Sequence, residues 1–237
     1  QVTVYEPETS FGMPSAHAQN AVAVWGEVAG WVKRSWFTGL AIGLMVVIGL
    51  SRIYLGVHFP TDVLVGWGLG LVVLWLFNRL THPVMQKLQN QGFIIQMLLV
   101  LVTSLALLLP SLLMVGLSGS WDMPAAWVQS LQTSGGTPPE PLSLDVPVSA
   151  AGTWLGFGSG ALWLNQRNPF HPKGKLWHRV AQYGVGIAIA LIIWAGLDYL
   201  FPEGATVIAY SLRYLRYTLL GGWIAAGAPW LFRRLHL

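Results

Sequence analysis

Five side chains with the chemistry to act on a phosphate group lie at the ends of long apolar runs in this chain. They are Ser15 and His17 before one run, and Arg52, His58 and Asp62 between the next two. Hydrolysis of a phosphate ester without a metal needs a nucleophile, an acid for the leaving group and positive donors around the phosphoryl oxygens. These residue types supply all three functions, so the sequence predicts that they converge on one phosphate at a membrane surface.

The spacing of His58 and Asp62 suggests which residue attacks phosphorus. A neutral imidazole nitrogen is a nucleophile when a carboxylate holds the other ring nitrogen as a donor. Asp62 lies four residues after His58, which is one turn if a helix starts near Pro60. His58 is therefore the predicted nucleophile and Asp62 its orienting carboxylate. The expected intermediate is a phosphohistidine that water then cleaves.

The remaining polar residues are candidates for binding and protonating the substrate. His17 opens the first apolar run and is the candidate general acid. Ser15 and the amides at that helix start can bind phosphate, because unpaired N–H groups and the helix dipole favour an anion. Arg52 offers a fork of donors to two phosphoryl oxygens.

These two groups of residues resemble signature motifs of the type 2 phosphatidic acid phosphatase family. Residues 14–17 read Pro-Ser-Ala-His and resemble the family's Pro-Ser-Gly-His. Residues 51–62 match the pattern Ser-Arg-x5-His-x3-Asp, with both gaps of the family's length. The resemblance implies the same roles for His58, His17 and Asp62, and phosphate binding by Arg52, Ser15 and Ser51. It covers roughly residues 11–70.

The sequence departs from the family pattern at two places. Ala16 stands where the family has glycine, so a small residue is kept but a methyl group faces the site. The family's first motif, Lys-x6-Arg-Pro, does not occur before Pro14, and the residues before it contain no Lys or Arg. We expect that motif to lie upstream of Gln1, because the chain does not start with Met; a degenerate site is the alternative.

Each residue also has a purely structural interpretation. His17 alone could be an interfacial histidine, Arg52 could extend to the headgroups, and Asp62 could simply serve a helix start. Together these explanations require five reactive side chains to meet at one membrane face by coincidence. Ionisable groups near membrane depth are functional candidates by default, so the catalytic interpretation is preferred.

The composition is that of a membrane-embedded protein. Of 237 residues, 54% are hydrophobic and only 9% are charged, with a mean hydropathy of +0.56, whereas soluble domains carry about 25% charged residues. Thirteen Trp and seven Tyr suit interfacial aromatic belts. The chain has no Cys, which excludes disulfides and thiolate metal sites. The net charge of +4 is spread over short loops and predicts no nucleic-acid binding.

Seven segments are apolar and long enough to be predicted as membrane spans. They are residues 17–32, 36–51, 62–80, 93–115, 147–165, 179–201 and 206–232. If the spans alternate, most Lys and Arg residues between them fall on one face, which the positive-inside rule makes cytoplasmic. Both motifs then face outward, into the periplasm if this is a bacterial inner-membrane protein.

Two arginines near the last span have two interpretations. Arg213 and Arg216 lie three residues apart and are flanked by Tyr210, Tyr214 and Tyr217. They either extend to the outer interface within a tyrosine belt or bind anionic lipid headgroups or a second phosphate. In the predicted span at 147–165, Gly152, Gly156, Gly158 and Gly160 favour close helix packing.

We therefore expect an all-α polytopic integral membrane bundle. Residues 1–90 form the predicted phosphatase core, and 91–237 add further transmembrane helices to the same membrane domain. The predicted activity is metal-independent and cofactor-free removal of phosphate from a lipid phosphate or diphosphate at the outer leaflet. Undecaprenyl diphosphate, phosphatidate and phosphatidylglycerophosphate are candidate substrates. The alternatives are a lipid phosphotransferase and a non-catalytic scaffold with a degenerate site. The oligomeric state is open.

Overall fold

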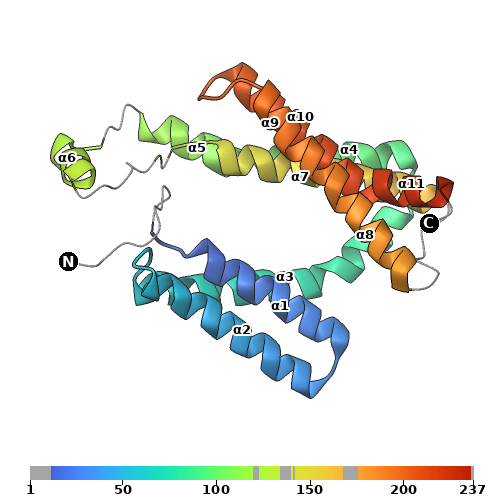
Figure 1. The fold of residues 1–237 in the computed structure, drawn as a ribbon, viewed down its shortest axis with the longest axis horizontal. Coiled ribbons are helices and arrows are strands. Elements are labelled where there is room, and N and C mark those ends of the chain that lie inside the picture. The colour runs from blue at the N-terminus through green and yellow to red at the C-terminus, as the bar shows by residue number, and fades with distance from the viewer. Residues whose placement is uncertain (1–11, 120–122, 134–139, 141, 168–175, 236–237) are drawn as a thin grey trace. The chain divides into compact units, whose positions relative to one another are not determined.

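The structure is a computed structural model that describes residues 12–119, 123–133, 140, 142–167 and 176–235 (Figure 1). Every regular element in these ranges is a helix. The described chain divides into two compact units, which are treated separately below. Unit 1 comprises the described parts of 1–89 and 122–141, and unit 2 those of 90–121 and 142–237.

Unit 1 contains the two motifs and four helices. These are α1 (Ala16–Val32), α2 (Ser35–Tyr54), α3 (Pro60–Gln89) and α6 (Ala125–Thr133). Helix α1 packs against both α2 and α3. It ends at Lys33, whose backbone adopts the left-handed conformation (φ 53°) and donates its N–H to the Ala29 carbonyl. The chain thereby turns sharply into α2, so that α1 and α2 lie side by side (Figure 1).

Helices α1 and α3 approach each other through two glycines of α3. Gly66 and Gly70 lie one turn apart on the same face. A Cβ at Gly66 would come within 2.6 Å of the Ser15 carbonyl oxygen, and one at Gly70 within 2.6 Å of the Gln19 carbonyl oxygen. Such small residues let helix backbones come close in membranes. The start of α1 is therefore held against the start of α3, where the motif residues are.

Unit 2 contains the remaining helices. These are α4 (Phe93–Ala106), α5 (Leu109–Ser118), α7 (Asp145–Gln166), α8 (Leu176–Leu191), the π-helical segment η1 (Ile192–Gly196), α9 (Leu197–Leu200), α10 (Val207–Gly222), a second π-helical segment η2 (Trp223–Gly227) and α11 (Ala228–Arg234). Helix α4 ends just before α5 because Pro110, in the first turn of α5, has no N–H to continue the hydrogen-bond ladder.

The main contact within unit 2 joins α7 to α10. A Cβ at Gly152 would lie 2.5 Å from the Tyr214 carbonyl oxygen, and one at Gly221 2.6 Å from that of Thr153. Gly156 faces the Thr218 carbonyl in the same way. The close packing predicted for the glycines of the span at 147–165 is therefore confirmed at Gly152 and Gly156.

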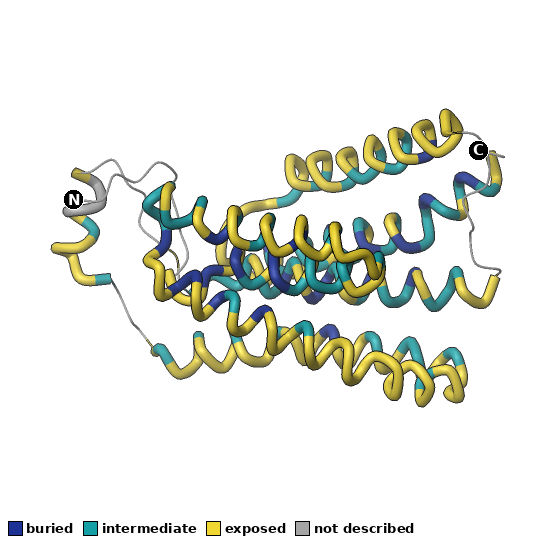
Figure 2. Tube along the Cα trace, turned by 90° about the horizontal axis from the view of Figure 1, so that it is seen from below, coloured by how far each residue is buried: buried dark blue, intermediate teal, exposed yellow. Residues whose placement is uncertain are grey.

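All seven predicted spans are helical in the structure. Among the described residues, four helical runs are long and apolar enough to cross a membrane by length and composition alone. They are Ser35–Tyr54, Pro60–Gln89, Phe93–Ser118 and Leu176–Leu200. Helices α1, α7 and α10 do not reach that standard, and α1 and α10 are only 17 and 16 residues long. Most residues on the apolar helices are exposed (Figure 2), as suits side chains that face lipid. The protein is an all-α integral membrane protein.

Candidate active site

The start of α1 is tied directly to the start of α3. The Ser15 backbone N–H donates to the Asp62 carbonyl oxygen at 3.0 Å. Ser15 is the N-cap of α1: its backbone is extended and its Oγ accepts the Ala18 N–H at 3.5 Å. The residue is fully buried. The prediction that the Ser15 hydroxyl binds phosphate is compatible with this geometry. The long capping hydrogen bond would then be replaced by a charge-assisted hydrogen bond to the phosphate.

His58 is held by a backbone carbonyl that the sequence did not indicate. Its Nδ1 lies 2.7 Å from the carbonyl oxygen of Gly12, 46 residues earlier. Because a carbonyl only accepts, Nδ1 carries the proton and donates it. In the neutral ring, Nε2 then has the free lone pair. His58 is 7% exposed, so this contact holds a buried imidazole in the tautomer that a nucleophile requires.

Asp62 lies beside His58, although it is not the closest partner of the ring. Its Oδ2 is 3.7 Å from His58 Nδ1, which is too long for a hydrogen bond. The same oxygen accepts the Phe59 backbone N–H at 2.8 Å, and Oδ1 lies 3.4 Å from the Thr61 hydroxyl. Asp62 thus serves the first turn of α3, as the structural interpretation expected, and adds a negative charge next to the imidazole.

The end of α2 presents Ser51 and Arg52. The Ser51 hydroxyl donates to the Ile48 carbonyl oxygen at 2.7 Å, and its oxygen lies 3.5 Å from Arg52 Nε. Both residues are partly buried. The positive charge of Arg52 also suits the negative end of the α2 dipole. Ser51 therefore lies next to the Arg52 side chain, and direct binding of phosphate by Ser51 remains a prediction.

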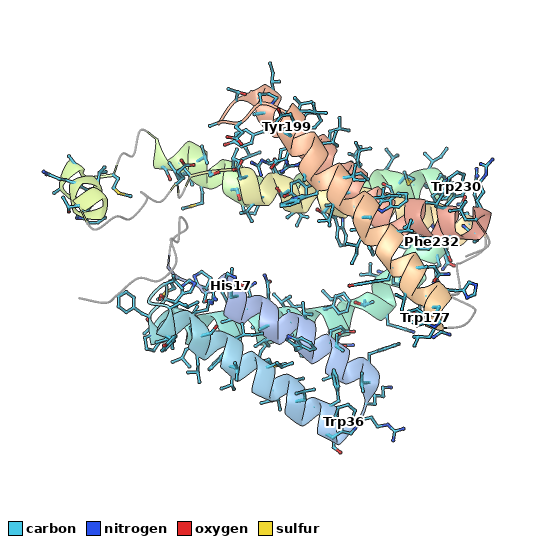
Figure 3. All side chains as sticks on the ribbon, in the orientation of Figure 1. His17, Trp36, Trp177, Tyr199, Trp230 and Phe232 are labelled. Atoms are coloured by element: carbon cyan, nitrogen blue, oxygen red, sulfur yellow. The ribbon has the colours of Figure 1, made fainter. Side chains whose placement is uncertain are left out.

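His17 lies in the first turn of α1 and is exposed (Figure 3). The first residues of α1 and α3 lie next to each other in space. His17 therefore lies at the same end of unit 1 as His58 and Asp62. The side chain is therefore available to a ligand that reaches this end of the helices.

Gly12 is the site residue that the motif analysis missed. Its carbonyl is the hydrogen-bond partner of His58, and a Cβ on Gly12 would lie 3.3 Å from Asp62 Oδ2. A side chain at this position would therefore crowd the carboxylate. In the sequence, Gly12 is a glycine two residues before the Pro14 motif. A glycine at that position predicts a loop, but it does not predict which side chain its carbonyl will bind.

Arg213 and Arg216 are held in ion pairs within unit 2. Arg213 Nε lies 3.1 Å from Asp145 Oδ1. Arg216 is 4% exposed and pairs through its guanidinium with Asp198 of α9, while its face covers the Tyr217 ring at 5.0 Å. Arg216 therefore does not extend toward the membrane interface, as one interpretation predicted, because its guanidinium pairs with Asp198 on the neighbouring helix. Headgroup binding by this pair remains a prediction.

Within the described part of the chain, no group of three or more His, Asp or Glu side chains is placed to hold a metal ion. The polar groups at this end of unit 1 are instead two imidazoles, one guanidinium, one carboxylate, two hydroxyls and backbone N–H groups. That set favours an anion.

This is an integral membrane protein whose two motifs meet at one end of unit 1. The chain belongs to the PAP2 superfamily. The family model described as PAP2 superfamily matches residues 1–86, and the model described as PAP2 superfamily phosphatase, transmembrane extension, matches residues 148–237.

Individual relatives differ in what they act on and in how much of the chain they match. The chain is 40% identical over 78 residues to phosphatidylglycerophosphatase B of Bacillus subtilis (strain 168), which covers 29% of the chain and 38% of that protein. It is 29% identical over 80 residues to lipid A 4'-phosphatase of Bacteroides thetaiotaomicron, covering 34% and 36%. It is 29% identical over 240 residues to glucose-6-phosphatase 3 of Homo sapiens, covering 94% and 65%. The chain thus spans less than two thirds of the length of these relatives. No solved structure matches it significantly.

Proposed function

We propose that this chain is a membrane phosphatase that uses His58 as its nucleophile. The observation that carries the proposal is the 2.7 Å contact between His58 Nδ1 and the Gly12 carbonyl. In the neutral ring this contact leaves the lone pair on Nε2, and the His58 side chain itself is buried. The PAP2 matches on both parts of the chain support the same activity.

The proposed reaction proceeds in two displacements. Nε2 of His58 forms a bond to phosphorus while the bond from phosphorus to the leaving oxygen breaks, and His17 donates a proton to that oxygen. His17, now neutral, takes a proton from water. The resulting hydroxide breaks the phosphorus–nitrogen bond and releases inorganic phosphate. The Asp62 carboxylate stabilises the positive charge that develops on the imidazole during the attack.

The phosphoryl oxygens are proposed to lie between the end of α2 and the start of α1. Arg52 contributes a positive charge from the end of α2, and Ser15 with the first amides of α1 contributes donors. Ser51 completes the set by orienting Arg52. No metal is needed in this scheme, so activity without added divalent cations is part of the proposal.

The proposed substrate is a lipid phosphate or diphosphate, such as undecaprenyl diphosphate or phosphatidylglycerophosphate. An apolar helical protein suits a substrate whose tail remains in the bilayer, and two of the relatives are named for lipid phosphates. The proposed location is a bacterial inner membrane with the motifs facing the periplasm. This follows from the distribution of Lys and Arg.

A water-soluble phosphomonoester is a second candidate substrate. The observation that favours it is the match to glucose-6-phosphatase 3, which extends over 94% of the chain, whereas the lipid phosphatases match about a third. A soluble substrate would require the same phosphate contacts, but no apolar surface for a tail.

The test compares wild-type protein with His58→Ala and His82→Ala. His82 is an exposed histidine far along α3 and serves as the matched control. Phosphate release is measured from phosphatidate, undecaprenyl diphosphate and glucose 6-phosphate, with and without an added alcohol acceptor. We expect His58→Ala to lose all but a few per cent of the activity and His82→Ala to keep it. Activity retained by His58→Ala would show that His58 is not the nucleophile. Transfer of the phosphoryl group to the added alcohol would indicate a transferase. Inactivity of the wild-type protein on every substrate would favour a non-catalytic scaffold.

A further inference from the structure

An apolar groove of about 680 Å³ lies between the two π-helical segments of unit 2. Ile193, Leu197 and Leu200 of η1 and α9 form one wall, and Leu219 and Trp223 of α10 and η2 form the other. Sites for small molecules usually measure about 300–1,000 Å³. Single turns of π-helix are rare and occur often at functional sites, and here two of them contribute to one groove.

Glycines and a fixed tryptophan shape this groove. Gly196 has helical backbone angles (φ −67°, ψ −42°), and a Cβ built on it meets no atom of the described residues within 4 Å. Glycine is disfavoured inside helices, so its presence here keeps a space open. The Trp223 indole donates its N–H to the Gly186 carbonyl at 3.0 Å, which fixes the ring as part of the wall. A Cβ on Gly227 would lie 2.5 Å from that ring.

A separate, charged pocket lies along the same two helical segments, because Leu197 and Leu200 of the groove adjoin Asp198 and Phe201 of the pocket in the chain. Arg216, Leu219 and Trp223 are spaced by three and four residues and therefore share one face of the helix. The neighbouring pocket is lined by Asp198, Glu203, Arg213 and Arg216. The Nε of Arg216 is buried and has no hydrogen-bond partner among the residues that the structure describes. The pocket thus contains both positive and negative groups.

We propose that the groove binds a zwitterionic phospholipid. One hydrocarbon chain lies between η1 and η2, the phosphate lies at Arg213 and Arg216, and the ammonium group lies at Glu203. The run Leu176–Leu200, which includes one wall, is apolar enough to cross a membrane, so the groove is open to lipid tails. The Glu203 carboxylate disfavours a headgroup that carries only negative charge, whereas the Asp198 carboxylate is already paired with Arg216. The site does not involve the phosphatase motifs.

Native mass spectrometry of the full chain in detergent tests the proposal. The protein is stripped of lipid and titrated with phosphatidylethanolamine or with phosphatidylglycerol of the same acyl chains. We expect one tightly bound phosphatidylethanolamine, bound at least tenfold more tightly than phosphatidylglycerol. Gly196→Trp, which fills the groove, should weaken that binding at least tenfold. Gly184→Trp is the matched control, because Gly184 is also an exposed helical glycine with open space at its Cβ.

Two further variants keep the test decisive. Leu219→Trp fills the groove from the opposite wall and replaces Gly196→Trp if the latter does not fold. Glu203→Gln should weaken binding of phosphatidylethanolamine and leave phosphatidylglycerol unchanged. Unchanged lipid binding in both groove-filling variants would overturn the groove as the site. Equal affinity for the two lipids in the wild type would overturn the zwitterionic assignment.

Discussion

Replacing Asp62 by asparagine separates the two effects that the site combines around His58. The hydrogen bond to the Gly12 carbonyl holds the ring tautomer, whereas Asp62 contributes charge at 3.7 Å from Nδ1. The asparagine side chain would keep an oxygen for the Phe59 N–H and remove only the charge. We therefore expect Asp62→Asn to fold normally, to keep the correct tautomer and to lose electrostatic stabilisation of the transition state.

The size of the loss follows from the geometry. Two unit charges 3.7 Å apart interact by about 4 kcal/mol at an effective dielectric constant of about 20, and by about 1 kcal/mol in bulk water. A site at a membrane surface lies between these limits. An expected loss of about 1–3 kcal/mol corresponds to roughly a 5- to 150-fold lower kcat.

The assay is inorganic phosphate release from a lipid phosphate in mixed micelles, with kcat and KM determined separately. Circular dichroism melting of Asp62→Asn and Asp62→Ala reports on stability, and only the alanine variant should lose about 1 kcal/mol because it loses the contact with the Phe59 N–H. If Asp62→Asn is as inactive as His58→Ala, Gly12 does not suffice to hold the tautomer. If its kcat equals that of the wild type, the carboxylate has no electrostatic role.

Three further predictions concern packing, mechanism and sidedness. Gly66→Ala places a Cβ 2.6 Å from the Ser15 carbonyl oxygen and should cost about 1–3 kcal/mol of stability, measured as a lower melting temperature. Gly68→Ala, with open space at its Cβ, should melt no lower than the wild type, and equal melting of both variants would contradict the close helix contact. Phosphate release should persist in EDTA and be inhibited by vanadate, which mimics the phosphoryl transition state; a requirement for added magnesium would point to another mechanism. A cysteine at Ala205 should react with a membrane-impermeant thiol reagent on intact spheroplasts and one at Gln86 should not, with no native Cys to interfere; the reverse pattern would turn the motifs toward the cytoplasm.

The helices of this protein are largely predictable because their cause is local. In a bilayer every backbone N–H and C=O must be satisfied within the segment, so a long apolar run becomes a helix whatever surrounds it. The seven predicted segments accordingly all appear as helices. The short helix α6 lies between the fourth and fifth predicted spans.

The motifs could also be recognised from the sequence. Side chains that act together at one end of a helix must be of particular types and must be separated by short, fixed numbers of residues. His58 and Asp62 are one turn apart, and they lie side by side in the structure. The division of the chain into a core up to residue 90 and an extension after it, and the role of each site residue, stay predictions that the experiments above address.

Tertiary structure decided which groups become partners. The Nδ1 proton of His58 is held by the Gly12 carbonyl, 46 residues away, and Arg216 pairs with Asp198 of another helix. Hydropathy and spacing describe one segment at a time, and they contain no information on which backbone carbonyl or carboxylate becomes a partner through packing. The sequence by itself determined the helices and the chemical groups available at their ends; only helix packing, through close contacts such as Gly66 against Ser15, decided how those groups meet.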